Sequence, residues 1–210
     1  MVGKTSIIQR FIDDSFVENG TQPTMAWDFK VKTMQLPESG DTVRLYLWDT
    51  AGQERFRHIA RMYYKDVAGV LLCFDLTDED SFKASNYWLA DLQRHAPEKI
   101  SKIFLGNKAD LCQGINSSRK ISQEQAQGFA TEHGMQYREV SAKTNEGIDQ
   151  AFLDLAVEIN KTHGSSVEMA LGGDQQVVIS ESERIGNIMN KKKLLKSGGQ
   201  AAAPKKSKCC

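Results

Sequence analysis

The chain has 210 residues, 40% of them hydrophobic and 26% charged, which suits one packed domain with a further segment. No stretch approaches the ~18 consecutive apolar residues of a transmembrane helix, and the N-terminus is not typical of a secretory signal peptide. Four Cys, two of them adjacent at the C-terminus, give no disulfide framework. These features exclude membrane-spanning and disulfide-rich secreted classes and favour a reducing, cytosolic setting.

The formal net charge of zero hides an asymmetry along the chain. Residues 191–208 hold seven Lys and no acidic residue, which leaves 20 basic against 27 acidic residues in positions 1–190. A basic tail on an acidic body indicates a negatively charged surface as partner. Charge alone leaves nucleic acid and anionic lipid both open.

The chain begins with a short motif, Gly3-Lys4-Thr5-Ser6. It matches the second half of the phosphate loop G-x-x-x-x-G-K-[ST], although three such common residues also occur by chance. Ile7, Ile8 and Phe11 follow at helical spacing and predict a short helix directly after the motif.

Hydrophobic runs then alternate with helical patterns, which predicts an α/β fold. Residues 27–36 and 43–48 alternate apolar and polar side chains around a turn-rich segment and predict a hairpin. Residues 69–75 and 102–108 are almost continuously apolar, as expected of buried parallel strands. A shorter third strand is predicted within residues 138–143.

Helices are predicted between these strands. Residues 81–95 and 147–161 carry apolar side chains at helical spacing. Ser122 and Gln125 predict a capping box, and Gly134 stands where a left-handed C-terminal residue belongs. From about Thr162 the pattern gives way to Gly, Ser, Gln, Lys and Ala. The sequence therefore predicts a folded domain over 1–161 and a mostly flexible tail over 162–210.

Polar motifs directly follow three of the predicted strands, where open α/β sheets bind their ligands. They are 49–54 (DTAGQE), 107–110 (NKAD) and 141–143 (SAK). Asp49 at a strand end is typical of a carboxylate on the magnesium side of a phosphate site, although an Asp standing alone there is better explained as a helix cap or turn residue. The Asp110 carboxylate can accept hydrogen bonds from the ring N–H and the amine of guanine, a pair that adenine does not offer. Thr24 can offer a hydroxyl to magnesium, or be an ordinary loop Thr.

The order of these motifs makes a chance occurrence of Gly3–Ser6 a poor explanation. With them, the sequence resembles the Ras superfamily of small GTPases and, within it, the Rab family. The similarity covers about residues 1–161 and includes the aromatic trio Phe29, Trp48 and Tyr63, which Rab proteins present to effectors. It also includes the terminal Cys209-Cys210, which matches the doubly prenylated end of Rab proteins. The fold implied is a P-loop NTPase G domain, with a mixed, mostly parallel sheet and helices on both faces.

The resemblance also implies roles for individual residues. GTP or GDP would be bound by Val2, Gly3, Lys4, Thr5, Ser6, Phe16, Thr24, Gly52, Asn107, Lys108, Asp110, Ser141, Ala142 and Lys143. Mg²⁺ would be held by Thr5, by Thr24 and, through water, by Asp49. Gln53 would orient the attacking water during GTP hydrolysis.

The implied function is a membrane-trafficking switch on the cytoplasmic face of an intracellular membrane, exchanging with the cytosol. The resemblance implies an exchange factor, a GTPase-activating protein, a dissociation inhibitor and effectors as partners. The chain has no evident arginine finger. An activating partner would therefore be needed to accelerate GTP hydrolysis, by ~10³–10⁵-fold. The Lys-rich tail with prenylated Cys209 and Cys210 would bind anionic lipid, and nothing supports binding of nucleic acid.

The chain departs from the family at its start. The family's first strand would lie between the strands predicted at 43–48 and 69–75, and without it their facing edges would expose buried polar groups at ~1–3 kcal/mol each. A domain is stable by only ~5–15 kcal/mol. We therefore expect the chain as printed not to fold stably as a GTPase, and Met1 to be an internal residue of a longer natural protein.

Two other function classes remain open. One is a Rab-shaped binding module that has lost nucleotide binding through its incomplete phosphate loop. The other is a P-loop ATPase or kinase, which Asp110 in its motif disfavours. Ala26 and Trp27 differ from the residues usual in Rab proteins, so no Rab subfamily or effector is assigned.

Overall fold

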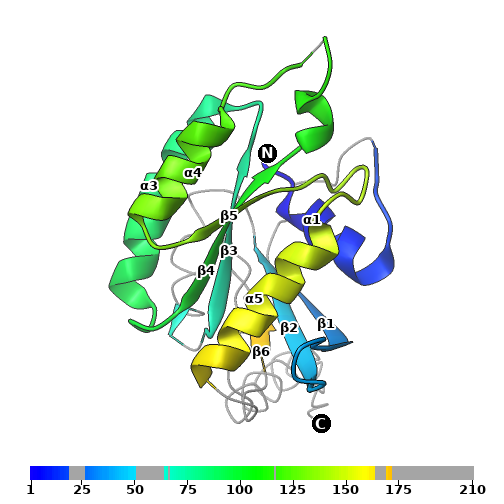
Figure 1. Ribbon diagram of the computed structural model, residues 1–210, viewed down its shortest axis with the longest axis vertical. Coiled ribbons are helices and arrows are strands. Elements are labelled where there is room, and N and C mark those ends of the chain that lie inside the picture. The colour runs from blue at the N-terminus through cyan, green and yellow to red at the C-terminus, as the bar shows by residue number, and fades with distance from the viewer. Residues whose placement is uncertain (19–26, 51–63, 66, 116, 164–168, 172–210) are drawn as a thin grey trace, which may run out of the picture.

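The computed structural model describes residues 1–18, 27–50, 64–65, 67–115, 117–163 and 169–171 (Figure 1). Five elements form the first half: α1 (Lys4–Asp13), β1 (Trp27–Gln35), β2 (Thr42–Thr50), β3 (Gly69–Asp75) and α3 (Glu79–His95). Six follow: β4 (Ser101–Asn107), the 3₁₀ helix η2 (Ala109–Cys112), α4 (Gln123–Glu132), β5 (Gln136–Glu139), α5 (Ile148–His163) and β6 (Met169–Leu171). The predicted site residues Thr24, Gly52, Gln53, Tyr63, Cys209 and Cys210 lie outside the described residues.

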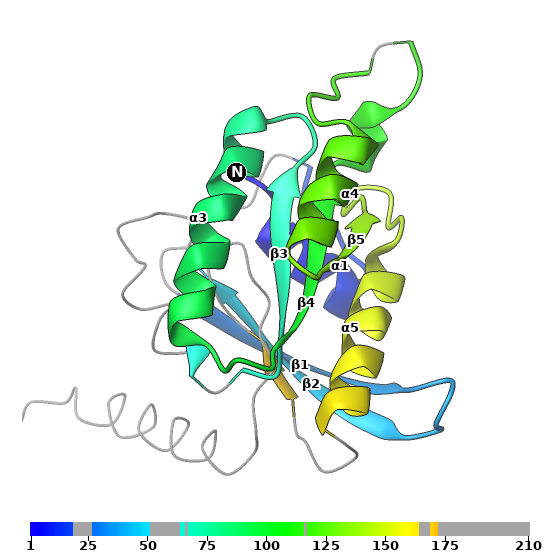
Figure 2. The same ribbon diagram turned by 60° about the vertical axis from the view of Figure 1, so that its left-hand side comes forward.

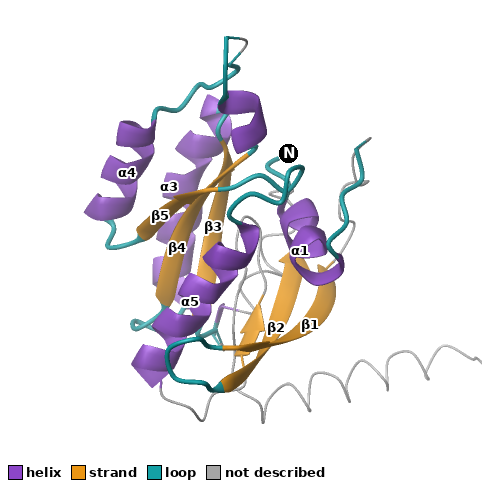
Figure 3. Cartoon of the chain, turned by 45° about the vertical axis from the view of Figure 1, so that its right-hand side comes forward, coloured by secondary structure: helices purple, strands orange, loops and turns teal. Residues whose placement is uncertain are grey.

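The described strands form two three-stranded sheets. β1 and β2 pair antiparallel, with Phe29 opposite Trp48, and this confirms the predicted hairpin. β3, β4 and β5 pair in parallel, and every residue of β3 is buried. Figure 3 shows the two groups of strands, with β1 and β2 next to α1. The near-continuous apolar runs are therefore buried parallel strands, as predicted.

Helices cover both faces of the parallel sheet. Alternate residues of β3 point to opposite faces: Val70, Leu72 and Phe74 pack in one buried cluster with α3 and α4, whereas Leu71 and Cys73 pack in another with α1 and α5. Figures 1 and 2 show α3 and α5 on different sides of β3 and β4. This arrangement confirms the predicted α/β architecture with helices on both faces.

α1 is fixed against α5 by aromatic stacking. The rings of Phe11 and Phe152 lie 3.8 Å apart, centroid to centroid, and are almost parallel. Both side chains are almost wholly buried. Because α1 carries the Gly3–Ser6 motif at its start, this packing holds the motif in place relative to the sheet.

The predicted helix ends are confirmed at α4. Ser122 and Gln125 form the reciprocal capping box, and Gly134 adopts a φ of 64°. The third parallel strand, however, begins two residues earlier than predicted and ends at Glu139. Beyond Val140 the backbone bridges to Glu146 instead, since Ser141 N–H donates to the Glu146 carbonyl at 3.0 Å.

The segment after α5 contains ordered structure near its start. α5 runs to His163, past the predicted boundary at 161, and β6 follows. β6 pairs in parallel with β2, on the edge away from β1, in the register Leu45 to Met169 and Leu47 to Leu171. The expectation of an unpaired edge on this strand is thus wrong along Leu45–Leu47, because buried backbone groups are satisfied by another segment of the chain.

Among the helices that the structure describes, none combines the length and the apolar character needed to cross a bilayer.

An ion-pair network fixes the end of β5. The Arg119 guanidinium donates from two nitrogens to the Glu139 carboxylate, at 2.8 and 2.6 Å, and the Tyr137 hydroxyl donates to the same carboxylate at 2.8 Å. These hydrogen bonds, led by that from Arg119, lower the pKa of Glu139 from its ordinary 4.5. Burial raises the pKa of Tyr137.

We expect Glu139→Gln to lower the free energy of unfolding by about 1–2 kcal/mol at pH 7, because the charged acceptor is lost. Since the folded-state pKa of Glu139 is depressed, its contribution is present above the unfolded pKa and lost as the pH falls through the folded value. Urea unfolding at several pH values should show the two proteins converging below about pH 4.5. Glu98→Gln, an exposed change, is the control; a difference from wild type that did not shrink with falling pH would contradict this role.

Candidate nucleotide-binding site

The start of α1 and the carboxyl ends of β2, β4 and β5 carry most of the predicted site residues. Gly3 precedes the helix with a φ of 89°, a left-handed conformation that favours glycine. A Cβ at this position would lie 2.6 Å from Nδ2 of Asn107. Gly3 is therefore required both by its backbone conformation and by the close approach of Asn107.

The first residues of α1 are suited to an anion. Lys4 is buried and is the first helical residue, and the helix begins with a hydrogen bond from Ile7 N–H to the Gly3 carbonyl at 3.0 Å. No side chain caps this end. The first backbone N–H groups of a helix and the positive end of its dipole favour a phosphate at such a helix start. Val2, which is buried, and Ser6 flank this position.

Thr5 and Asp49 meet at the end of β2. The Thr5 hydroxyl donates to Oδ2 of Asp49 at 2.6 Å, and Asp49 is only 3% exposed. A hydroxyl and a carboxylate oxygen side by side are ligands that suit Mg²⁺. The structure therefore brings together two of the three predicted metal residues. Among the described residues, no cluster of three or more His, Cys, Asp or Glu is placed to bind a metal elsewhere.

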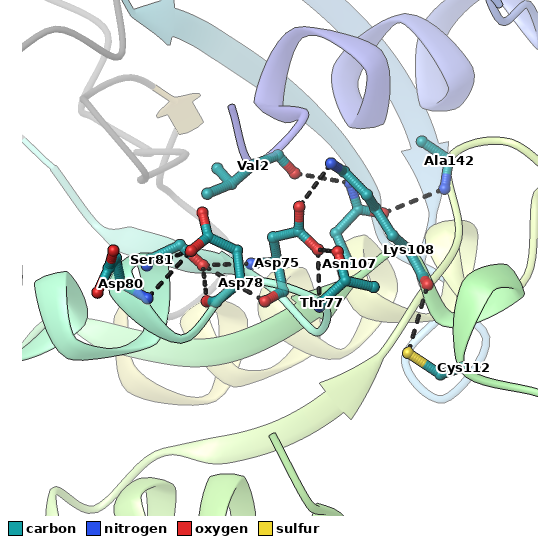
Figure 4. Close-up of polar contacts among 10 residues, drawn as sticks. All are labelled: Val2, Asp75, Thr77, Asp78, Asp80, Ser81, Asn107, Lys108, Cys112 and Ala142. Atoms are coloured by element: carbon teal, nitrogen blue, oxygen red, sulfur yellow. Dashed lines mark hydrogen bonds and ion pairs between the residues drawn. The ribbon is translucent and has the colours of Figure 1, made fainter. Parts of the chain in front are cut away.

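Asn107, at the end of β4, joins three segments of the chain (Figure 4). Its Nδ2 donates to the Val2 carbonyl at 2.8 Å, and its Oδ1 accepts from the Ala142 N–H at 3.3 Å. The side chain is buried, with 2% exposed. Asn107 thereby connects the segment before α1 with the loop after β5.

Asp110, the carboxylate of the 107–110 motif, accepts a hydrogen bond from the 141–143 motif. The Ser141 hydroxyl donates to Oδ1 of Asp110 at 2.6 Å, and Thr144 N–H donates to the same hydroxyl oxygen at 3.1 Å. Asp110 lies in η2, directly after β4, and is partly buried. The structure thus places the residues predicted for base recognition, Asp110 and Ala142, on adjacent loops.

Lys108 points to a residue that the sequence reasoning did not include. Its φ is 67°, and its ammonium lies 2.5 Å from Oδ2 of Asp75, the last residue of β3. The other oxygen of Asp75 accepts from the N–H and hydroxyl of Thr77, at 2.8 and 2.7 Å. Figure 4 shows Asp75 between Lys108 and Thr77. Asp75 could have been found from its position in the sequence, because it ends an apolar strand just as Asp49 does.

Four more predicted residues lie nearby or on the outer hairpin. Phe16 is partly buried against the cluster that contains α1 and α5. The Lys143 ammonium donates to Glu18 at 2.8 Å and lowers the pKa of that carboxyl. On the hairpin, the rings of Phe29 and Trp48 lie 4.6 Å apart, so two of the three predicted effector-facing aromatics are in contact.

Comparison with known proteins decides the family. A model of the Ras family matches residues 1–161. The chain belongs to the Ras family. It is a small GTPase with a Ras-type G domain, and its enzymatic class is GTP hydrolase.

Curated relatives assign this GTPase to the Rab branch. GTP-binding protein ypt2 of Schizosaccharomyces pombe is 44% identical over 160 residues, which cover 76% of each chain. Ras-related protein RABE1e of Arabidopsis thaliana is 41% identical over 160 residues, covering 76% of this chain and 71% of the relative. Ras-related protein RAB1BV of Beta vulgaris is 36% identical over 209 residues, covering 100% of this chain and 87% of the relative.

Proposed function

We propose that this Rab-family GTPase is a GTP/GDP-dependent switch of membrane trafficking that binds guanine nucleotide across α1 and the ends of β2 and β4. The observation that carries the proposal is the convergence of two groups of residues at one edge of the fold. Thr5 and Asp49 meet on the phosphate side, at 2.6 Å. Ser141 and Asp110 meet on the base side, also at 2.6 Å, and Asn107 joins the two sides.

On the phosphate side, the buried Lys4 and the backbone N–H groups at the start of α1 would bind the β- and γ-phosphates. Thr5 and Asp49 fit Mg²⁺ by their chemistry, because both offer oxygen. Mg²⁺ would supply charge neutralisation between phosphate oxygens. Thr24, Gly52 and Gln53, which lie outside the described residues, would complete this side in the GTP state and orient water.

On the base side, Asp110 would accept two N–H groups of guanine, and the Ala142 amide would donate to its carbonyl oxygen. Lys108 and Lys143 would pack along the ring by their aliphatic stems, with Phe16 at its edge. Asp75 holds the Lys108 ammonium at 2.5 Å, so the direction of that stem is set by β3.

The remaining parts of the proposal concern partners and place. The Lys-rich tail and prenylated Cys209 and Cys210 would bind the chain to the cytoplasmic face of an intracellular membrane, because one lipid chain alone binds only marginally. An exchange factor, an activating protein, a dissociation inhibitor and effectors would act on the switch. Phe29, Trp48 and Tyr63 would contact effectors.

The test is the nucleotide content and nucleotide preference of the 210-residue chain. The protein is purified in Mg²⁺, its folding is verified by circular dichroism, and it is denatured to release ligand for ion-exchange chromatography. Because β6 pairs with the edge of β2 that the sequence predicted to be unpaired, we expect the chain, contrary to the expectation from sequence, to fold and to hold about one GDP or GTP. A fluorescent GDP should be displaced by GTP but not by ATP. A folded chain that holds no guanine nucleotide and does not bind added GDP would overturn the proposal and favour a nucleotide-free binding module.

A further inference from the structure

Arg10 contacts the loop that follows β5, although 132 residues separate them in the sequence. It lies near the end of α1, and its side chain is only 14% exposed. Its Nε donates to the Ala142 carbonyl at 2.9 Å, and its Nη2 donates to the Lys143 carbonyl at 3.1 Å. One planar guanidinium therefore holds two successive carbonyl groups of the loop.

The third nitrogen of Arg10 is directed to its own helix end. Nη1 donates to the backbone carbonyl and to Oδ1 of Asp14, at 2.8 and 2.9 Å. Asp14 ends α1 in the left-handed conformation, and its Oδ1 also accepts from the Asn145 side chain at 3.0 Å. The guanidinium fork is thus held from one side by the helix end and presented to the loop in a single orientation.

One further contact, an ion pair, joins the same two segments at their outer edge. The Lys143 ammonium donates to Glu18, which follows α1, at 2.8 Å. Both side chains are exposed, so this pair alone positions little. In Figure 1 the loop between β5 and α5 passes beside α1. Arg10 is the less exposed of the cations in this contact and makes two of its hydrogen bonds to the loop backbone.

α1 consequently contacts both halves of the candidate site. Its first residues, Gly3–Ser6, form the phosphate side, and Arg10 near its other end holds the backbone of Ala142 and Lys143. The backbone of Ala142 is then held in both of its peptide groups: the carbonyl accepts from Arg10 on one side, and the N–H donates to Asn107 on the other.

We propose that Arg10 is a positioning residue for base recognition: by holding the Ala142 and Lys143 carbonyls, it fixes the backbone of Ala142, whose N–H donates to Asn107 and would be shared with the 6-carbonyl oxygen of a bound guanine. This inference rests on the proposed nucleotide site. It predicts a selective effect, because only nucleotides that carry a 6-carbonyl oxygen use that N–H.

The experiment measures dissociation constants of the full chain in Mg²⁺ for three ligands: GDP, inosine diphosphate, and the diphosphate of 2-aminopurine riboside, which lacks the 6-oxygen. Arg10→Ala should weaken GDP and inosine diphosphate about equally, by ~3–10-fold, the value of one hydrogen bond. The 2-aminopurine ligand should change less than about twofold. Arg94→Ala, which removes an exposed Arg near the end of α3, is the matched control and should change none of the three.

Arg10→Lys keeps the charge but replaces the fork with a single ammonium, so it should recover part of the loss for the two 6-oxo ligands. If circular dichroism shows Arg10→Ala to be unfolded, the three dissociation constants are compared between wild type and Arg10→Lys instead. An equal loss for all three ligands would reduce Arg10 to a general structural residue, and an unchanged GDP affinity would also overturn the inference.

The wild-type measurement distinguishes failure of the proposed nucleotide site from failure of the role proposed for Arg10. If the wild-type chain binds no GDP, the proposed function fails. Hydrogen exchange then reports the positioning role without ligand: amides of residues 142–145 should exchange faster in Arg10→Ala than in wild type, and not in Arg94→Ala. Unchanged exchange would contradict the role of Arg10 in holding the loop.

Discussion

Replacing Asp110 with Asn should lower the affinity for GDP by about 10²–10⁴-fold. The carboxylate would accept two N–H groups of guanine, and each hydrogen bond to a charged acceptor contributes about 1.5–3 kcal/mol. An Asn amide has one oxygen that accepts and one nitrogen that donates. One of the two hydrogen bonds from guanine is therefore lost, and the other is made to an uncharged acceptor. Asn keeps an oxygen that can accept from Ser141, which holds Asp110 at 2.6 Å, so the loop is preserved.

The measurement is competition of GDP and xanthosine diphosphate against a fluorescent GDP. Xanthine carries an oxygen where guanine carries its amine, so Asp110→Asn should bind xanthosine diphosphate better than wild type does. Glu132→Gln, a carboxylate-to-amide change at the exposed end of α4, is the control and should leave both affinities unchanged. Equal GDP affinity in wild type and Asp110→Asn would remove Asp110 from the base side of the site.

Asn107→Ala should lower both the free energy of unfolding and the affinity for GDP. The change deletes the donor to the Val2 carbonyl and the acceptor of the Ala142 N–H, both of which are buried. Each buried polar group left without a partner costs about 1–3 kcal/mol. The free energy of unfolding should therefore fall by about 2–6 kcal/mol, a large share of the ~5–15 kcal/mol typical of a domain.

Urea unfolding without added nucleotide measures this cost, and GDP titration of the variant measures the loss of binding. Asn86→Ala, an exposed change on α3, removes the same side chain where it makes only a 3.4 Å contact to a backbone carbonyl. It should lower the free energy of unfolding by less than about 0.5 kcal/mol. If Asn107→Ala lowered the free energy of unfolding by as little as Asn86→Ala, Asn107 would not hold the segment of Val2 and the loop of Ala142 together.

Both predictions concern residues that the sequence pattern singles out without showing their contacts. Asn107 and Asp110 stand out because a polar motif directly follows an apolar strand, and such a motif lies at the ligand edge of a parallel sheet. That pattern does not reveal that Asn107 contacts the backbone of Val2, which is 105 residues away. The sequence also does not single out Asp75 and Arg10, because an Asp at a strand end and an Arg near a helix end are ordinary residues in those positions.

The sequence by itself determined the buried strand of residues 69–75 and, with a displacement of one residue, that of residues 101–107. It also determined the hairpin, the helix faces, the capping box at Ser122 and the motifs that assign the family. These follow from local periodicity, local turn and cap chemistry and motif order, all of which are written in neighbouring residues. The tertiary structure alone decided that Arg10 holds the Ala142 loop, that Asp75 holds Lys108, and that Met169–Leu171 pairs with β2. Contacts between distant segments depend on how packed elements bring backbone groups together, and hydrophobic periodicity carries no information about which carbonyl a guanidinium will reach.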